Sequence, residues 1–110
     1  RFAGLLYGKS KADICASKGI FEGEHLIEML LAGAKCTQVV STLYKNGIKK
    51  AAEIIKELEN WMDKKGYENI DDFRGKLSLK NVKDPFAYQR AQYVDILWKS
   101  DKVYKNIRQV

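Results

Sequence analysis

Two short segments of the chain combine residue types that can bind an anion, namely hydroxyl side chains and a glycine. The first segment is Ser17, Lys18 and Gly19, and the second is Ser41 and Thr42. Hydroxyls and backbone N–H groups donate hydrogen bonds to a phosphate, and a glycine lets the backbone approach it closely. Either these residues bind a phosphate, or Ser41 merely caps a helix and Gly19 merely makes a tight turn.

Each segment comes at the end of an apolar run of strand length. The first run is residues 12–17 ("ADICAS"), and the second is residues 35–41 ("KCTQVVS"), which is rich in Val and Thr. Runs of this length and composition predict two buried strands.

The segment between the two strands predicts an amphipathic helix that ends at Gly33. Apolar residues recur on one face of this helix, and the glutamates lie off that face. The apolar set is Leu26, Ile27, Leu30 and Leu31, and the glutamates are Glu22, Glu24 and Glu28.

A longer helix is predicted after the second strand, from about Ile48 to a stop at Gly66. Residues 41–47 ("STLYKNG") fit a short helical segment that precedes it. The stripe expected to be buried on the longer helix is Ile48, Ala51, Ala52, Ile55, Leu58 and Met62.

The order strand–helix–strand–helix predicts the α/β class, with parallel strands and a right-handed crossover in an open sheet or a barrel. Ligands bind at the carboxyl ends of such strands. In barrels, the loops after the seventh and eighth strands and a short extra helix commonly hold a phosphate, and residues 41–47 fit that helix. Two strands are too few for a stable sheet, and the chain opens at Arg1, so we expect a fragment with a processed, trimmed or engineered start.

Helices are also predicted at the two ends of the chain. Phe2, Leu5 and Leu6 are apolar at helical spacing before a stop at Gly8. Near the other end, Asp84 and Pro85 fit the N-cap and the first position of a helix. The apolar stripe of this last helix must pack against something, and it comprises Phe86, Ala87, Ala91, Val94, Leu97 and Trp98.

The net charge of +6 is concentrated near the C-terminus. Residues 1–75 hold 12 Lys/Arg and 11 Asp/Glu, whereas residues 76–110 hold 8 and 3. The basic part could contact nucleic acid or another anionic surface, or it could be a solvated helical face. The basic residues are scattered instead of clustered, which does not favour nucleic acid, and no apolar run is long enough to span a membrane.

The remaining candidate side chains favour structural roles. Cys15 and Cys36 lack metal-ligand spacing and lie in apolar runs, so we expect buried free thiols in a reducing cytoplasm and no metal site. His25 is expected on an exposed helix surface, without a catalytic role. Five aromatic residues are expected to serve in packing: Tyr7, Tyr44, Tyr67, Trp61 and Trp98.

Three stretches together resemble the C-terminal segment of the FMN-dependent dihydroorotate dehydrogenase family. "GIFEGEHLIEMLLAGAKCTQVVSTLYKNG" resembles its last two strand–helix units, where the family has Gly-Gly-Ile, a helix ending in Ala-Gly-Ala and a strand ending in Gly-Thr-Ala-Leu. "WMDKKGYENIDDFRGKLS" is similar to the segment after its last barrel helix. "NVKDPFAYQRAQYVDILW" resembles the extension of a dihydroorotate-dehydrogenase-like branch, so the resemblance covers roughly residues 12–98.

The resemblance implies an FMN phosphate bound by Lys18, Gly19, Ser41 and Thr42. Gly19 matches the second glycine of the family's pair, and Thr42 matches the threonine of Gly-Thr. Lys18 and Ser41 stand where the family has glycine. A lysine there would crowd the phosphate or pair with it as a cation, and it would be strained at a positive φ.

The resemblance also implies a role for each part of the chain. Residues 1–75 would form the last two units (β7-α7-β8-α8) of a flavin-binding TIM (β/α)8 barrel, and residues 76–110 a basic helical extension. The intact enzyme would oxidise dihydroorotate, or a similar small molecule, to orotate in pyrimidine biosynthesis, and is expected to be a cytoplasmic homo-oligomer.

The catalytic residues of the family lie in earlier strands, so we expect none in this chain, and we expect the isolated chain to be inactive without the remainder of the barrel. The alternative is a non-enzymatic binding or interaction module that uses the basic C-terminal helix, for example by docking it on a partner subunit.

Overall fold

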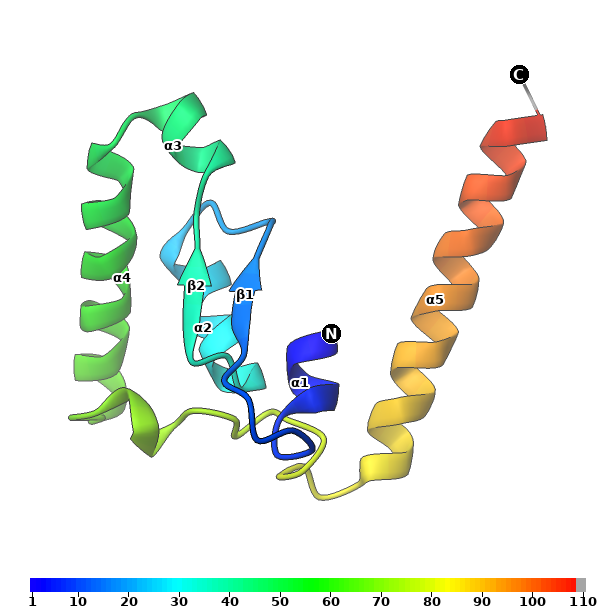
Figure 1. Ribbon diagram of the computed structural model, residues 1–110, viewed down its shortest axis with the longest axis horizontal. Coiled ribbons are helices and arrows are strands. Elements are labelled where there is room, and N and C mark those ends of the chain that lie inside the picture. Colours follow the sequence, from blue (N-terminus) through cyan, green and yellow to red (C-terminus); the bar gives the residue numbers. More distant parts are fainter. Residues whose placement is uncertain (109–110) are drawn as a thin grey trace.

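The computed structural model describes residues 1–108, with the side chains of residues 1–95, 97 and 99. The predicted order of strands and helices is confirmed, although both strands are shorter than expected (Figure 1). The elements are α1 (Phe2–Leu6), β1 (Cys15–Ser17), α2 (Gly23–Ala32), β2 (Cys36–Gln38), α3 (Ser41–Asn46), α4 (Lys49–Lys65), the 3₁₀ turn η1 (Ile70–Asp72) and α5 (Pro85–Arg108).

The two strands form a parallel pair, as predicted. Ala16 lies opposite Thr37 in the register, and α2 is the crossover that connects the strands. In Figure 1, α2 lies behind the strands and α4 runs beside them. The described chain is therefore a small α/β unit in which helices cover one side of a two-stranded sheet.

The other face of the strands is open, and it carries both cysteines. Successive residues of a strand point to opposite faces. Ala16 and Thr37 are half-buried, whereas Cys15 and Cys36 are exposed and free. The prediction of free thiols is confirmed and the prediction of buried thiols is wrong, because no element within residues 1–108 covers this face.

A single apolar cluster joins α2, α4 and the segment after α4. The predicted apolar face of α2 is confirmed, since Leu26, Ile27 and Leu30 are buried while its glutamates are exposed. Gly33 ends this helix with a φ of 122°. The buried members of the cluster are Ile20, Leu26, Ile27, Leu30, Ile54, Leu58 and Phe73.

The buried stripe of α4 is rotated from the predicted one. Ile54 is 4% exposed, whereas Ile55 is 54% and Ile48 is 84% exposed. The helix contacts α2 along the line of Ile54 and Leu58, and no element within residues 1–108 covers the neighbouring line that carries Ile48 and Ile55. Periodicity alone could not separate these lines, because both are apolar at helical spacing.

The aromatic residues near the C-terminal end of α4 pack together as predicted, whereas the aromatic residue of α3 does not pack. Trp61, Tyr67 and Phe73 form a cluster with ring centroids 5.0 to 5.7 Å apart. Tyr44 is 89% exposed, which contradicts its predicted packing role. It follows the buried Thr42 by two residues, about 200° around the helix, and so faces away from the core. The side chain of Trp98 lies outside the described residues.

Tyr7 connects three parts of the chain that are distant in sequence. Its half-buried ring lies against both Gly33, at the end of α2, and Gly75. The backbone N–H of Leu77 donates to the carbonyl oxygen of Leu31 at 2.9 Å, and that of Leu79 donates to Gly4 at 2.8 Å. The segment after η1 is thus held against both α1 and α2.

Arg74 ties the same segment to the start of β2. Its Nη1 donates hydrogen bonds to the carbonyl oxygens of Ala34 and Lys35, the latter at 2.8 Å. Its Nε donates to Asp71 at 3.0 Å. The guanidinium therefore links η1 to the loop that enters the second strand.

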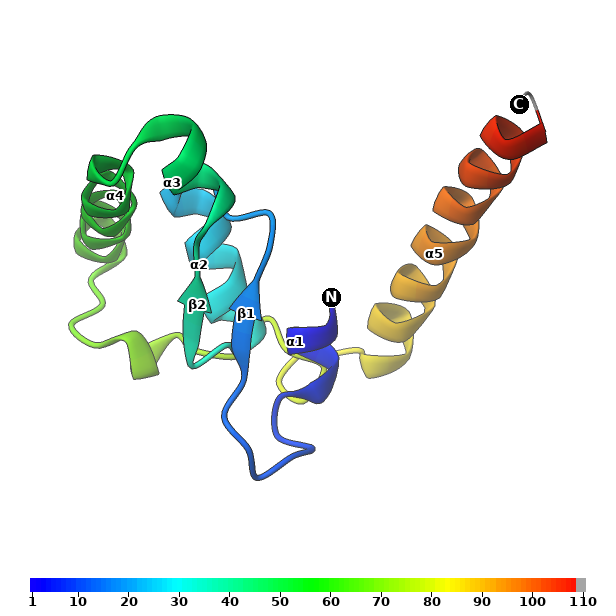
Figure 2. The same ribbon diagram turned by 45° about the horizontal axis from the view of Figure 1, so that its top comes forward.

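The last helix begins as predicted but does not pack as predicted. Asp84 caps α5, because its Oδ1 accepts a hydrogen bond from the N–H of Ala87 at 3.0 Å. The described members of the predicted stripe are exposed, with Phe86 at 79% and Val94 at 55%, and the side chain of Trp98 lies outside the described residues. Figures 1 and 2 show that α5 leaves the body beside α1 and extends away from the other helices. Within residues 1–108, no helix is both long and apolar enough to cross a membrane.

We expect Gly33→Ala to lower the free energy of unfolding by several kcal/mol. A Cβ at Gly33 would meet the Tyr7 ring, and alanine would also adopt an unfavourable φ of 122°. Overpacking costs roughly 1–3 kcal/mol and a positive φ roughly 1–2 kcal/mol. The matched control is Gly47→Ala, where φ is 83° but nothing lies within 4 Å of the Cβ. Urea denaturation followed by tryptophan fluorescence measures both, and equal losses would contradict the packing role of Tyr7.

We expect Cys36→Ala to accelerate alkylation of Cys15 by iodoacetamide at about pH 8. A hydrogen bond with the Cys36 thiol raises the pKa of Cys15, so less of the reactive thiolate is present. Without Cys36, the pH profile of labelling, measured by peptide mass spectrometry, should move to lower pH. Ser17→Ala, on the same strand face, is the control, and an unchanged profile in Cys36→Ala would refute this coupling.

Candidate functional site

A cavity opens at the carboxyl ends of β1 and β2. Its volume is about 210 Å³, and it is lined by residues 17–21 after β1 and residues 38–41 after β2. Because the strands are parallel, both carboxyl ends meet at the same edge of the sheet. The structure thereby brings the two segments of the predicted anion site together.

The loop after β1 takes a left-handed backbone conformation at two successive residues. Lys18 and Gly19 both have a φ of 72°, and Lys18 is the one non-glycine residue with a positive φ among residues 1–108. This agrees with the strain expected for a lysine at this position. A Cβ at Gly19 would meet nothing within 4 Å, so the space in front of this glycine is open. A tight turn would also require this φ, so the structural alternative for Gly19 remains.

Ser41 lines the cavity and does not cap the short helix. The N-cap of α3 is Val40, no side chain donates or accepts a cap hydrogen bond, and Ser41 is the first helical residue. The structure therefore does not support the alternative in which Ser41 merely caps a helix. The side chain of Ser41 is exposed at the mouth of the cavity, where its hydroxyl is available to an anion.

Thr42 lies beside the cavity without lining it. The residue as a whole is 1% exposed, and its Oγ1 accepts a hydrogen bond from Nδ2 of Asn46 at 3.3 Å. The first N–H groups of a helix have no intrahelical acceptor, so the backbone of Thr42 remains a donor at the start of α3. Lys18, Gly19 and Ser41 line the cavity together. The hydroxyl of Thr42 instead accepts a hydrogen bond from Asn46 within α3.

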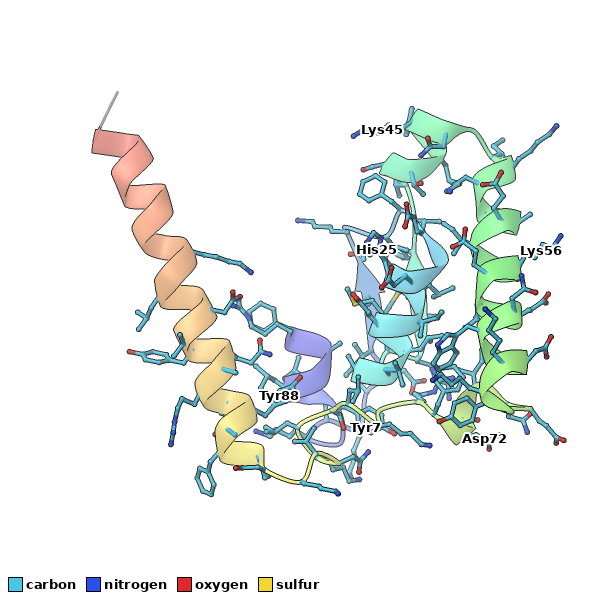
Figure 3. All side chains as sticks on the ribbon, turned by 180° about the vertical axis from the view of Figure 1, so that it is seen from behind. Tyr7, His25, Lys45, Lys56, Asp72 and Tyr88 are labelled. Atoms are coloured by element: carbon cyan, nitrogen blue, oxygen red, sulfur yellow. The ribbon has the colours of Figure 1, made fainter. Side chains whose placement is uncertain are left out.

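Three further residues support the loop after β1, and the sequence did not single out their function. His25 is half-buried instead of exposed, and its Nδ1 accepts a hydrogen bond from the N–H of Phe21 at 3.2 Å. Lys45 lies over the Phe21 ring, with its Nζ 5.5 Å from the ring centroid. Figure 3 shows His25 and Lys45 on the part of the molecule that carries α3. The only feature of the sequence that could have indicated this hydrogen bond is the four-residue spacing between Phe21 and His25.

The groups around the cavity favour binding over proton transfer. The lining residues include hydroxyls, the amide of Gln38 and the ammonium of Lys18, and they include no carboxylate. A fixed positive charge with hydrogen-bond donors suits an anion such as a phosphate. No cluster of three or more possible metal-binding side chains is found among the described residues.

No family model matches the chain. Several known enzymes do share extensive sequence with it. It is 46% identical over 69 residues to dihydroorotate dehydrogenase A (fumarate) of Lactococcus lactis, which is 63% of this chain and 22% of that enzyme. It is 45% identical over 65 residues to dihydroorotate dehydrogenase (fumarate) of Lachancea kluyveri, which is 59% of this chain and 21% of that enzyme.

The corresponding enzyme of Saccharomyces cerevisiae is 43% identical over 65 residues, again 59% of this chain and 21% of that enzyme. The chain thus spans about a fifth of the length of the relatives that it matches. Over 59% to 63% of its own length the chain is similar to fumarate-type dihydroorotate dehydrogenases, and this confirms the family resemblance inferred from the sequence.

Proposed function

We propose that this chain is the C-terminal segment of an FMN-dependent oxidoreductase that converts dihydroorotate to orotate in pyrimidine biosynthesis. The similarity to fumarate-type dihydroorotate dehydrogenases supports the activity. The meeting of Lys18, Gly19 and Ser41 at the ends of two parallel strands is the observation that carries the proposed site. The non-enzymatic alternative has no comparable support.

In this proposal β1, α2, β2 and α4 are the last two strand–helix units of a TIM (β/α)8 barrel, and α3 is its short extra helix. Both edges of the two-stranded sheet are then paired by the remainder of the barrel. The open face that carries Cys15 and Cys36 is turned to the barrel interior, which accounts for exposed thiols in apolar strands. Residues 1–75 form the barrel segment, and residues 76–110 form the basic helical extension.

The FMN phosphate is held by Lys18, Gly19, Ser41 and Thr42. The open space in front of Gly19 admits the phosphate close to the backbone. Ser41 donates through its hydroxyl and N–H, and Thr42 contributes its N–H at the start of α3, since its hydroxyl is hydrogen-bonded to Asn46. Lys18 supplies a positive charge to the phosphate. When bound, the flavin accepts the hydride that dihydroorotate loses.

The rest of the reaction belongs to other parts of the intact enzyme. We propose no catalytic residue in this chain, because the groups around the cavity bind and orient but include no general base. The isolated chain is therefore inactive. The intact enzyme is cytoplasmic, acts on a small-molecule substrate and forms a homo-oligomer.

A chimera tests this proposal directly. The segment of the Lactococcus lactis enzyme that corresponds to residues 12–75 is replaced by those residues, and the purified protein is examined by visible absorption and by reduction with dihydroorotate. We expect equimolar bound FMN and reduction of the flavin. A chimera that folds by circular dichroism and lacks FMN, while the unaltered enzyme retains it, would refute the proposed site.

In this chimera, we expect Gly19→Ala to weaken FMN binding at least about tenfold, a loss of roughly 1.4 kcal/mol, because its Cβ enters the space proposed for the phosphate. Gly66→Ala is a matched control, since its φ is 74° against 72° for Gly19, and neither Cβ meets an atom within 4 Å. Both variants should lose similar stability. Titration of the apo-chimera with FMN, followed by flavin fluorescence, measures the affinity, and equal weakening by both would contradict the assignment.

We expect Lys18→Gly to change stability and FMN affinity in opposite directions. Glycine relieves the positive φ at this position and should raise the free energy of unfolding by about 0.5–1 kcal/mol. Loss of the ammonium should weaken FMN binding by about fivefold, since an exposed charge pair contributes up to about 1 kcal/mol. Lys35→Gly, in the loop before β2, is the control and should not stabilise, because Lys35 has no positive φ to relieve. If Lys18→Gly left the FMN affinity unchanged, the proposed contact between Lys18 and the FMN phosphate would be refuted.

A further inference from the structure

The start of α2 is capped by a side chain of α4. The loop after β1, residues 18–22, leads directly into α2. Its last residue, Glu22, is the N-cap of α2 but makes no side-chain cap hydrogen bond, although the first N–H groups of a helix require an acceptor. The N–H of Gly23 donates instead to Oε2 of Glu57 at 2.5 Å. The end of the loop is therefore fixed by α4 and not by its own N-cap side chain.

Gly23 lets the two helices approach closely at this point. It is buried, and a Cβ on it would meet the side chain of Glu57 and, at 3.2 Å, the backbone carbonyl oxygen of Ile54. A residue without a side chain allows this approach, and a carboxylate suits the positive end of a helix. The contact between Glu57 and Gly23 thus rests on close packing, although Glu57 is an exposed residue.

The loop after β1 is held at three successive places. The side chain of Ile20 is buried in the apolar cluster, and the N–H of Phe21 donates to Nδ1 of His25 at 3.2 Å. The bond from Gly23 to Glu57 is the third anchor. The two residues with a left-handed backbone directly precede these anchors. All three contacts lie within the described chain, so they do not depend on what covers its open surfaces.

We propose that Glu57 is a positioning residue of the flavin-phosphate site, a role that rests on the proposed function. Its carboxylate fixes the first residue of α2 and thereby holds the loop in the conformation in which Lys18 and Gly19 meet the phosphate. Glu57 acts through the loop, since it does not line the cavity at the strand ends. A loop that is only partly ordered lowers the apparent affinity in proportion to its ordered fraction.

Glu57→Ala tests this role in the chimera that carries residues 12–75. We expect FMN affinity to fall at least about tenfold, because a hydrogen bond to a charged group is lost and about a tenth of the loops remain ordered. Glu57→Gln should keep the affinity within about threefold of the unaltered chimera, since its amide oxygen can accept the same bond. Titration of the apo-chimera with FMN, followed by flavin fluorescence, measures both variants.

Two control variants on α4 separate positioning from stability. Glu53→Ala removes an exposed glutamate one turn earlier, whose carboxylate pairs with Lys50. Ile54→Val shortens a buried side chain in the contact with α2 and should lower the midpoint of urea unfolding. Neither control should weaken FMN binding measurably. Equal weakening by Glu57→Ala and Ile54→Val, or a failure of Glu57→Gln to retain the affinity, would overturn the proposal.

Hydrogen exchange of the full chain tests the same anchor without flavin. Peptides that cover residues 18–25 should exchange faster in Glu57→Ala than in the unaltered chain, as measured by mass spectrometry, whereas Glu57→Gln and Glu53→Ala should match the unaltered chain. Identical exchange in Glu57→Ala and the unaltered chain would contradict the anchoring. An unaltered chimera without FMN refutes the proposed function, whereas a chimera that binds FMN equally well in every variant refutes only the role of Glu57.

Discussion

The arrangement of this chain depends on the parallel pairing of two three-residue strands. A parallel pair cannot be joined by a tight turn, so the chain must cross over through α2, which in turn must bury an apolar face. That face packs against α4 through Ile54 and Leu58. The same pairing places both carboxyl ends at one edge, which is why residues 17–21 and 38–41 line one cavity although sixteen residues separate them in the sequence.

Much of this could be predicted from local signals in the sequence. Gly33 and Gly66 mark the ends of α2 and α4, and Asp84 with Pro85 marks the start of α5, because each of these signals acts through a few neighbouring backbone atoms. The meeting of Lys18 and Ser41 was also predictable, since it follows from strand direction alone. Such signals do not depend on what surrounds the chain.

The predictions that were wrong depended on the surroundings of a residue. Cys15 lies in β1 and Ile48 is the N-cap residue of α4, and sequence alone suggested that both side chains would be buried. Both are exposed, because burial requires a neighbouring element on that particular face. For Thr42, the sequence could not distinguish a hydroxyl at the mouth of a cavity from one that accepts a hydrogen bond within its own helix. The sequence also could not show that His25 accepts a hydrogen bond from the loop after β1, because that depends on how the loop folds against α2.

The hydrogen bond between Phe21 and His25 determines the form of the histidine ring. The Nδ1 lone pair accepts from the Phe21 amide, so a neutral ring must carry its proton on Nε2. An imidazolium has N–H groups at both positions and cannot accept this bond. The conformation of the loop that carries Lys18 and Gly19 is therefore matched to one neutral tautomer of a single imidazole.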